Sequence, residues 1–284
     1  MNTPRQKMGR PIGGKRMAPM ADAKRVVSLL NRHRSENQCF EPQGVSLIYT
    51  GRYGNANVYC YSDKERDLVV KDFSQCVPWF KYTMGAFFVA KECRCIRALS
   101  GTGGVVSNVQ KLGKHAFCYD FVKGASISSI VNENRKLPGE FFRKWERLVK
   151  EMHAQGIVHL DMRNTGNVLM DEGGRPVIID FQSALRTRFM PGFLRKILER
   201  VDYSAVIKGW LKSCDDKLPP EQAAWYAEFL KSRNIWKKLT HPGRLISVGF
   251  WSVVDLFRRK KTQRRLIFGL LLLGIGTGIT VALQ

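Results

Sequence analysis

The sequence predicts an α+β protein of two lobes, with a small antiparallel sheet and one helix first, a larger helical lobe second, and a transmembrane helix at the C-terminus. Three observations predict this fold. Short β-rich runs punctuated by glycine fill residues 45–122. Helical periodicity dominates residues 139–257, and residues 266–283 carry no charge.

The chain has 284 residues, of which 44% are hydrophobic and 11% aromatic, so most of it is expected to be globular. It is long enough for one large or two modest domains. We divide it into a basic flexible arm with a short helix, the sheet lobe, the helical lobe, and a basic flank with an apolar tail. These parts are residues 1–38, 39–122, 123–257 and 258–284.

The net charge of +23 is concentrated at the two ends of the chain. Residues 1–38 hold nine Lys/Arg against two Asp/Glu, and residues 191–265 hold 17 against 7, whereas residues 39–190 hold 21 against 15. Such flanks favour an anionic partner, which would be a membrane face or nucleic acid. The basic arm carries no interleaved aromatic motif, so we expect the membrane surface rather than nucleic acid.

The C-terminal tail predicts a membrane anchor. Residues 266–283, "LIFGLLLLGIGTGITVAL", are 18 uncharged residues, about 27 Å long as a helix and enough to cross a bilayer core. The six basic residues in "RRKKTQRR", 258–265, place the rest of the chain in the cytoplasm of a single-pass inner-membrane protein. The alternative is a buried hairpin or core helix. Gly274 and Gly278 form a GxxxG pattern through which two copies could pair as a homodimer.

Seven cysteines show no CxxC spacing, so a zinc site is not expected. Reduced thiols that serve as small apolar fillers are the better interpretation.

The expected elements follow in order. After a basic helix over 21–34, three strands are predicted in "VSLIYTG", "NANVYCYS" and "DLVVKDF", then a helix in "FFVAKECRCIRALS" and two strands in "GVVSNVQKLG" and "HAFCYDFV". The second lobe begins with a long helix in "LPGEFFRKWERLVKEMHAQG", which Gly156 ends. Two short strands in "NVLM" and "PVIID" precede further helices over 191–257. A cleft between the lobes is expected to collect the polar loops.

Asp180 ends a buried hydrophobic strand, a place where a carboxylate needs a cation. A lone aspartate there would equally fit a helix N-cap or a salt bridge, but Asp161 and Asn167 lie shortly upstream. Carboxylate and amide oxygens suit Mg²⁺. Asp161 would then accept a proton from an attacking hydroxyl group, and His159 is expected to be a packed, hydrogen-bonded structural residue.

"HLDMRNTGNVLM" and "VIIDFQSA" together resemble the catalytic and metal-binding loops of the protein-kinase-like superfamily. "TGRYGNANVYCY" supplies two glycines where the superfamily keeps a phosphate-covering turn, and "LVVKDF" supplies a lysine on the third strand. Glu92 is the single acidic residue between Ser74 and Ser100, at the place of the partner glutamate. The resemblance covers roughly residues 45–212.

The resemblance implies ATP and Mg²⁺ as cofactors and assigns a role to each matching position. The residues implied in nucleotide binding are Gly51, Gly54, Val58, Lys71, Glu92, Tyr119 and Phe121. The residues implied in metal binding are Asn167 and Asp180, and those implied in catalysis are Asp161, Lys71 and Arg163.

Within the superfamily, "IIDFQSA" resembles the aspartate loop of RIO-like kinases and of lipopolysaccharide core-sugar kinases. These groups lack a long activation segment, and here helix-like sequence resumes near Pro191. Asp202 is expected to brace the catalytic loop. Three positions depart from the general pattern: Gln182 replaces a glycine, Leu160 replaces an arginine, and Asn167 follows Asp161 by six residues instead of five.

The function favoured by the resemblance is a RIO-like serine/threonine kinase at the cytoplasmic face of a bacterial membrane. One alternative is a kinase for a lipid-linked sugar of the lipopolysaccharide core. The other is a nucleotide-binding membrane scaffold without activity, which the presence of the catalytic residues disfavours.

Overall fold

The computed structural model describes residues 16–33, 39–51, 54–78 and 81–239. The chain forms two compact units, residues 1–217 and 218–284. Within the second unit the described part is helix α7 (Pro220–Leu239). No helix in the described ranges is both long and apolar enough to cross a bilayer. The predicted span at residues 266–283 lies outside those ranges.

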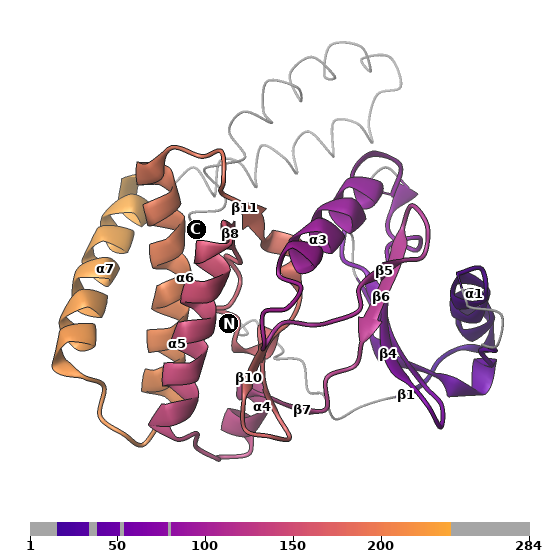
Figure 1. Cartoon of the computed structure of the whole chain (residues 1–284), viewed down its shortest axis with the longest axis horizontal. Coiled ribbons are helices and arrows are strands. Elements are labelled where there is room, and N and C mark those ends of the chain that lie inside the picture. Colours follow the sequence, from indigo (N-terminus) through magenta and orange to yellow (C-terminus); the bar gives the residue numbers. More distant parts are fainter. Residues whose placement is uncertain (1–15, 34–38, 52–53, 79–80, 240–284) are drawn as a thin grey trace, which may run out of the picture. The chain divides into compact units, whose positions relative to one another are not determined.

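A six-stranded antiparallel sheet forms the first lobe of the first unit (Figure 1). Its strand order is β1-β2-β3-β4-β6-β5. The strands are β1 (Arg16–Met17), β2 (Val45–Tyr49), β3 (Asn57–Ser62), β4 (Asp67–Asp72), β5 (Gln110–Lys111) and β6 (Ala116–Asp120). The arm predicted to be flexible therefore contributes a strand, because Arg16 and Met17 pair with Leu47 and Ser46.

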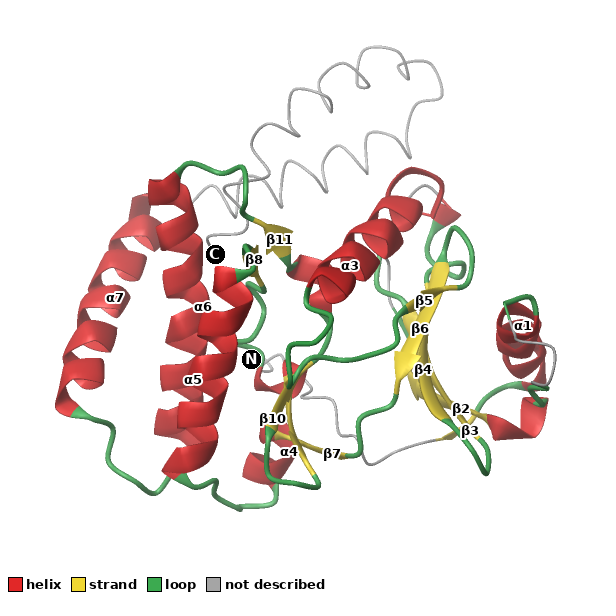
Figure 2. Ribbon diagram, in the orientation of Figure 1, coloured by secondary structure: helices red, strands yellow, loops and turns green. Residues whose placement is uncertain are grey.

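Helices α1 (Met20–Asn31) and α3 (Ala86–Ala98) lie on opposite faces of this sheet (Figure 2). Helix α1 packs an apolar face on the sheet, and Arg25 joins it to the sheet by an ion pair of 2.9 Å with buried Asp72 and a 3.0 Å bond to the Tyr59 hydroxyl. The predicted helix is thus present, and its buried apolar residues belong to the same hydrophobic core as those of the sheet.

Helix α3 follows a π-helical turn, η2 (Lys81–Gly85), and covers the other face of the sheet. Side chains alternate between the faces of a strand, so Lys71 on β4 lies on the α3 side while its neighbours Val70 and Asp72 lie on the α1 side. The strand predicted over residues 104–113 is much shorter. Gly104 and Asn108 have positive φ angles of 100° and 52°, which interrupt extended backbone.

The second lobe is mainly helical and carries two small sheets, ordered β10-β9-β7 and β11-β8. Its helices are α4 (Ile127–Asn132), α5 (Gly139–Ala154) and α6 (Gly192–Ser213). Its strands are β7 (Gly124–Ser126), β8 (Ile157–Val158), β9 (Val168–Asp171), β10 (Pro176–Ile178) and β11 (Leu185–Arg186). Single 3-10 turns are η1 (Pro42–Gly44), η3 (Thr165–Asn167) and η4 (Phe181–Ser183).

Helix α5 matches its prediction closely. Pro138 is its N-cap, and Gly156 with φ +72° follows its end. The apolar face predicted from the periodicity is buried, namely Phe141, Trp145, Leu148, Val149 and Met152.

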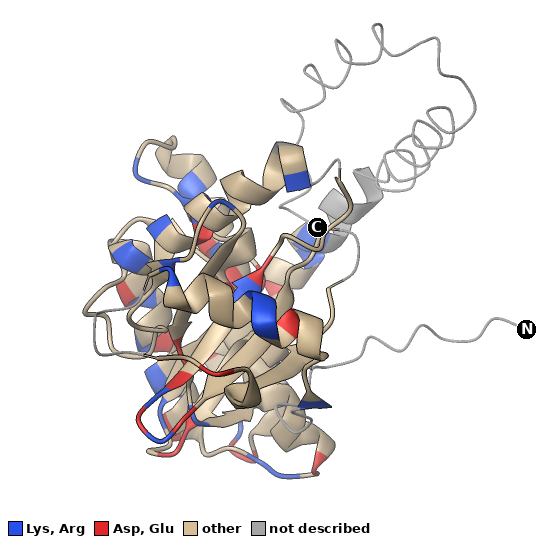
Figure 3. Ribbon diagram, turned by 90° about the vertical axis from the view of Figure 1, so that its right-hand side faces the viewer, with Lys and Arg blue, Asp and Glu red and all other residues tan. Residues whose placement is uncertain are grey.

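Basic and acidic residues are interspersed on the face of the molecule shown in Figure 3. This face therefore carries both signs of charge, whereas the surplus of Lys and Arg counted in the sequence is greatest in residues 1–38 and 191–265.

Buried thiols fill the core of the sheet lobe. Cys60, Cys76, Cys93, Cys95 and Cys118 are buried, and none of the seven cysteines is in a disulfide. Burial raises the pKa of Cys118 to about 12 and that of Cys76 and Cys93 to about 11.

We predict that iodoacetamide at pH 8 modifies exposed Cys39 in the native protein and leaves the five buried cysteines unmodified until denaturant is added, because the thiolate is the reactive form. Peptide mass spectrometry with and without denaturant measures this. Modification of native Cys118 as fast as Cys39 would contradict the packing described above.

Candidate functional site

A hollow between the two lobes contains six of the residues predicted from the sequence. Both lobes contribute to its walls: strands β2, β3, β4 and β6 on one side, and the segments around η3 and β10 on the other. The lining residues are Ile48, Tyr49, Val58, Val69, Lys71, Tyr119, Phe121, Val122, Gly166, Asn167, Leu169, Ile179 and Asp180.

Lys71 joins three elements at the inner end of this hollow. Its Nζ lies 2.6 Å from Glu92 Oε1 on helix α3 and 2.8 Å from Asp180 Oδ1, which follows strand β10. Lys71 is 3% exposed, and Glu92 is fully buried. The predicted Lys71–Glu92 pair is therefore present, and the same ammonium group also holds the aspartate.

Electrostatics keep this lysine charged. Burial by itself would lower the pKa of Lys71, but Asp180 and Glu92 outweigh it and raise the pKa above its ordinary value. Burial raises the pKa of the Glu92 carboxyl, although Lys71 opposes that change. The result is a fixed positive charge at the wall of the hollow.

Asp180 is held in a left-handed conformation, with φ 65° and ψ 69°. For a residue with a side chain this backbone costs roughly 1–2 kcal/mol, so its surroundings must impose it. The preceding residue is fixed on both sides, since Ile179 N donates to Asn167 O at 3.0 Å and Ile179 O lies 3.1 Å from His159 Nε2. The following residue, Phe181, is buried with its ring edge-on to the His159 ring at 4.9 Å.

Asp202 on helix α6 braces the loop before Asp161, as the sequence predicted. Its carboxylate accepts the backbone N–H groups of His159 and Leu160, each at 2.7 Å. Leu160 has a φ of +67°, so these two bonds stabilise a strained turn immediately before Asp161. His159 is fully buried and hydrogen-bonded, which confirms its structural role.

Asn167 and Asp161 contact each other in spite of the longer spacing between them. Asn167 Nδ2 donates to Asp161 Oδ2 at 2.8 Å and to Asp161 O at 3.1 Å. Asn167 ends the 3-10 turn Thr165–Asn167, before which the Asn164 side chain accepts Gly166 N at 3.3 Å. Asn167 consequently reaches the same hollow as Asp180.

Arg163 is tied to helix α6. Its Nη1 donates to Ser204 Oγ at 2.6 Å, and its carbonyl accepts Lys208 Nζ at 2.8 Å. Arg163 was predicted from the sequence, whereas Ser204 and Lys208 were not. The four-residue spacing of Ser204 and Lys208 predicts that they share one helix face. Nothing in the sequence indicates that this face contacts Arg163 on a distant loop.

The predicted glycine turn lies between strands β2 and β3. Gly51 N donates to Asn57 Oδ1 at 2.7 Å, and a Cβ added at Gly51 would collide with the Asn55 carbonyl. The turn therefore requires glycine at position 51. Gly54 follows residues 52–53, which lie outside the described ranges.

Several lining residues were missed by the sequence analysis. Val69 stands two residues before Lys71 on the same strand face, so strand alternation could have found it. Leu169 and Ile179 come from the other lobe, and only the tertiary fold brings them to this hollow.

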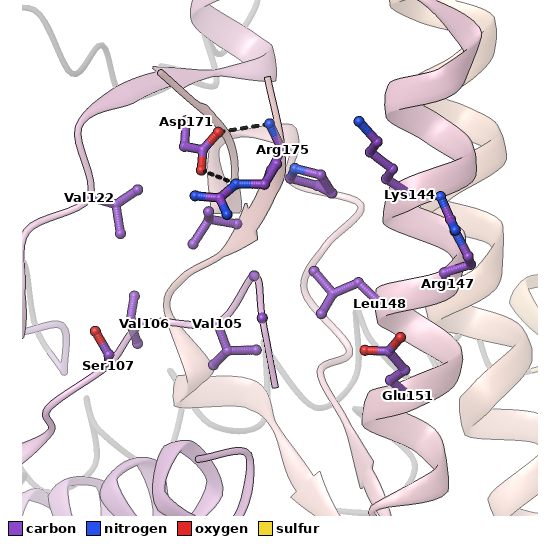
Figure 4. Close-up of a pocket in the computed structure, with 14 residues that line it drawn as sticks. Val105, Val106, Ser107, Val122, Lys144, Arg147, Leu148, Glu151, Asp171 and Arg175 are labelled. Atoms are coloured by element: carbon purple, nitrogen blue, oxygen red, sulfur yellow. Dashed lines mark hydrogen bonds and ion pairs between the residues drawn. The ribbon is translucent and has the colours of Figure 1, made fainter. Parts of the chain in front are cut away.

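A larger cavity of about 520 Å³ lies elsewhere in the first unit, between helix α5, the β9–β10 hairpin and residues 103–107 (Figure 4). It contains none of the predicted site residues, although Val122 lines both hollows. Its Arg175 is paired with Asp171 at 2.9 Å, and both arginines in its wall are exposed. The smaller hollow carries the buried charges, so we assign the candidate site there.

Comparison with known families supports the protein-kinase-like assignment. A model of the RIO domain family matches residues 80–208, which run from the turn before α3 into the last third of α6. The match includes Glu92, Asp161 and Asp180, while Lys71 and the glycine turn precede it. The sequence matches none of the curated proteins.

We predict that Asp202→Ala lowers the free energy of unfolding by about 3 kcal/mol, because the buried N–H group of His159 and the partly buried N–H group of Leu160 lose their acceptor. Asp202→Asn should lose less, since its amide oxygen still accepts a hydrogen bond. Urea denaturation followed by circular dichroism measures both.

The matched control is Glu133→Ala, which removes an exposed ion pair with Arg135 and should change stability by about 0.5 kcal/mol or less. A loss for Asp202→Ala as small as that of the control would show that Asp202 does not brace the loop.

Proposed function

We propose that this protein is a RIO-like kinase that transfers the terminal phosphate of ATP to a hydroxyl group. The observation that carries the proposal is the buried ammonium group of Lys71, shared by Glu92 and Asp180 at the wall of an apolar hollow. The family match to a RIO domain supports an ATP-dependent phosphotransferase in general.

The apolar part of the hollow suits the base of a nucleotide. Val58 and Val69 come from the sheet lobe, and Leu169 and Ile179 come from the helical lobe, so a flat ring would be enclosed from both sides. Tyr119 and Phe121 lie at the edge where the two lobes connect. The Phe121 backbone N–H already donates to Asp67 O at 2.8 Å, so Phe121 would contact the base through its ring or its carbonyl.

Lys71 would bind the phosphates nearest the sugar. Its positive charge is fixed by two carboxylates, and its side chain needs no reordering when the nucleotide enters. The glycine turn at Gly51 lets backbone approach the phosphates without obstruction by a side chain.

The donor set beside Lys71 fits Mg²⁺. The Asp180 carboxylate and the Asn167 amide line the same hollow, and a hard ion usually takes one or two protein oxygens together with phosphates. Bound there, Mg²⁺ would neutralise charge on the phosphates. The backbone bond between Ile179 and Asn167 keeps these two donors on adjacent segments.

Asp161 would orient the acceptor hydroxyl and accept its proton. The Asn167 amide donates to one carboxylate oxygen and so fixes the direction of the carboxylate. The brace from Asp202 to the backbone just before Asp161 holds the loop in place. Arg163, tied to Ser204, would add positive charge beside the loop.

For location and acceptor, we propose a cytoplasmic catalytic unit anchored by residues 266–283, acting on serine or threonine of a protein at the membrane. Support comes from the uncharged run and the basic residues 258–265 before it. A lipid-linked sugar is the alternative acceptor.

We predict that Asp180→Asn reduces phosphotransfer by about 10³-fold or more, because the metal donor and a partner of Lys71 are both weakened. The assay uses γ-labelled ATP with the full chain in detergent. Asp215→Asn, at a side chain that is 78% exposed, is the matched control and should keep its rate. Near-normal transfer by folded Asp180→Asn would refute the assigned role.

The same assay identifies the acceptor. Label in a protein band supports the proposed protein kinase, and label in the lipid extract supports the lipid-linked sugar. Label released only as free phosphate indicates an ATPase cycle. No turnover of label by the folded wild type would favour the inactive scaffold.

A further inference from the structure

Exposed apolar side chains gather where helix α6 begins. Phe189 is 93% exposed, Phe193 is 70% exposed and Ile197 is 38% exposed. Single exposed apolar residues are common on soluble proteins. Phe189 and Phe193, however, lie within five residues of each other, and neither side chain packs into the core of the first unit.

Basic residues surround these side chains. Residues 186–200 contain five Lys/Arg and one Asp/Glu, and Arg188, Arg195 and Lys196 are all exposed. The single acidic residue, Glu199, lies 3.4 Å from Arg195 Nε. Exposed phenylalanines among lysines and arginines are typical of segments that lie in the interface of an anionic membrane. We call residues 186–200 the α6 entry surface.

The α6 entry surface lies on the catalytic side of its helix. Phe193, Ile197, Ser204 and Lys208 are separated by four, seven and four residues, so they share one helix face. Ser204 and Lys208 on that face both bond Arg163 of the catalytic loop. Ile197 precedes Ser204 by about 10 Å along the axis.

We infer that the α6 entry surface docks on an anionic lipid bilayer, with Phe189 and Phe193 inserted among the headgroups and the basic residues on the lipid phosphates. The lysines and arginines are attracted to the anionic surface, and the phenylalanines add apolar burial. A bilayer is favoured over a protein partner because apolar and basic groups are interleaved along the segment.

Docking would turn the catalytic loop toward the membrane. Only this consequence rests on the proposed kinase function: the acceptor hydroxyl would then be presented at the bilayer surface. The docking itself depends on residues outside the site and is tested separately from activity.

The test uses the full chain with Phe189→p-benzoylphenylalanine and radiolabelled phosphatidylcholine vesicles, with or without phosphatidylglycerol. Illumination should couple position 189 to lipid, at least about tenfold more with phosphatidylglycerol than without it. The matched control places the same photoreactive group at Leu211, a 58% exposed apolar position near the other end of α6. Labelling there should be about tenfold weaker than at position 189 in the anionic vesicles.

A second variant adds Arg188→Glu and Lys196→Glu to the position-189 protein and should reduce lipid labelling about tenfold, with an unchanged circular dichroism spectrum. Adding Asp180→Asn instead should leave lipid labelling unchanged, which separates docking from catalysis. Coupling of position 189 to residues 218–284 or to a second copy, in place of lipid, would overturn the inference. Equal lipid labelling at positions 189 and 211 would also overturn it.

Discussion

A lysine buried between two carboxylates is the interaction on which the rest of the candidate site depends. Burial of Lys71 is unfavourable without a carboxylate partner, since an unpaired buried charge costs several kcal/mol, and Glu92 and Asp180 both pair with it. Glu92 belongs to helix α3 and Asp180 to the helical lobe, so the same ammonium group fixes helix and lobe relative to the sheet. The charge that stabilises this arrangement is also the charge that a nucleotide phosphate would meet.

The helical lobe supplies a second constraint, which is the backbone of the two polar loops. Leu160 and Asp180 both have positive φ angles, and each is held by neighbours outside its own loop. Asp202 bonds the first loop from helix α6, while the buried His159 and the Asn167 carbonyl hold the residue before Asp180. Local strain is thus balanced by distant contacts, which is common where side chains must point into a reaction site.

Much of the site could be predicted because its residues are ordered along the sequence in a pattern set by local structure. Apolar patterning predicted the strand before Asp180 and the helix α5 almost to its ends, whereas Lys71 and Glu92 were assigned through the resemblance to the protein-kinase-like superfamily. Contacts between distant segments could not be predicted. Arg25 pairs with Asp72 and so docks α1 on the sheet, and Arg163 pairs with Ser204. The local sequence pattern around these residues indicates neither contact. The long strand expected at 104–113 failed because Asn108 adopts a positive φ that no composition rule requires.

The function proposed above requires that Lys71, Asp180 and Asn167 bind the phosphates and the divalent ion of one nucleotide. The most direct test is a crystal structure of the full chain with Mn²⁺ and a non-hydrolysable ATP analogue, in which anomalous scattering locates the metal. We expect one anomalous peak within coordination distance of Asp180 and Asn167 oxygens, with Lys71 Nζ on the phosphates and the base between Val58 and Leu169. A nucleotide bound instead beside Arg147 and Arg175 in the larger cavity, or a metal away from Asp180, would contradict the claim.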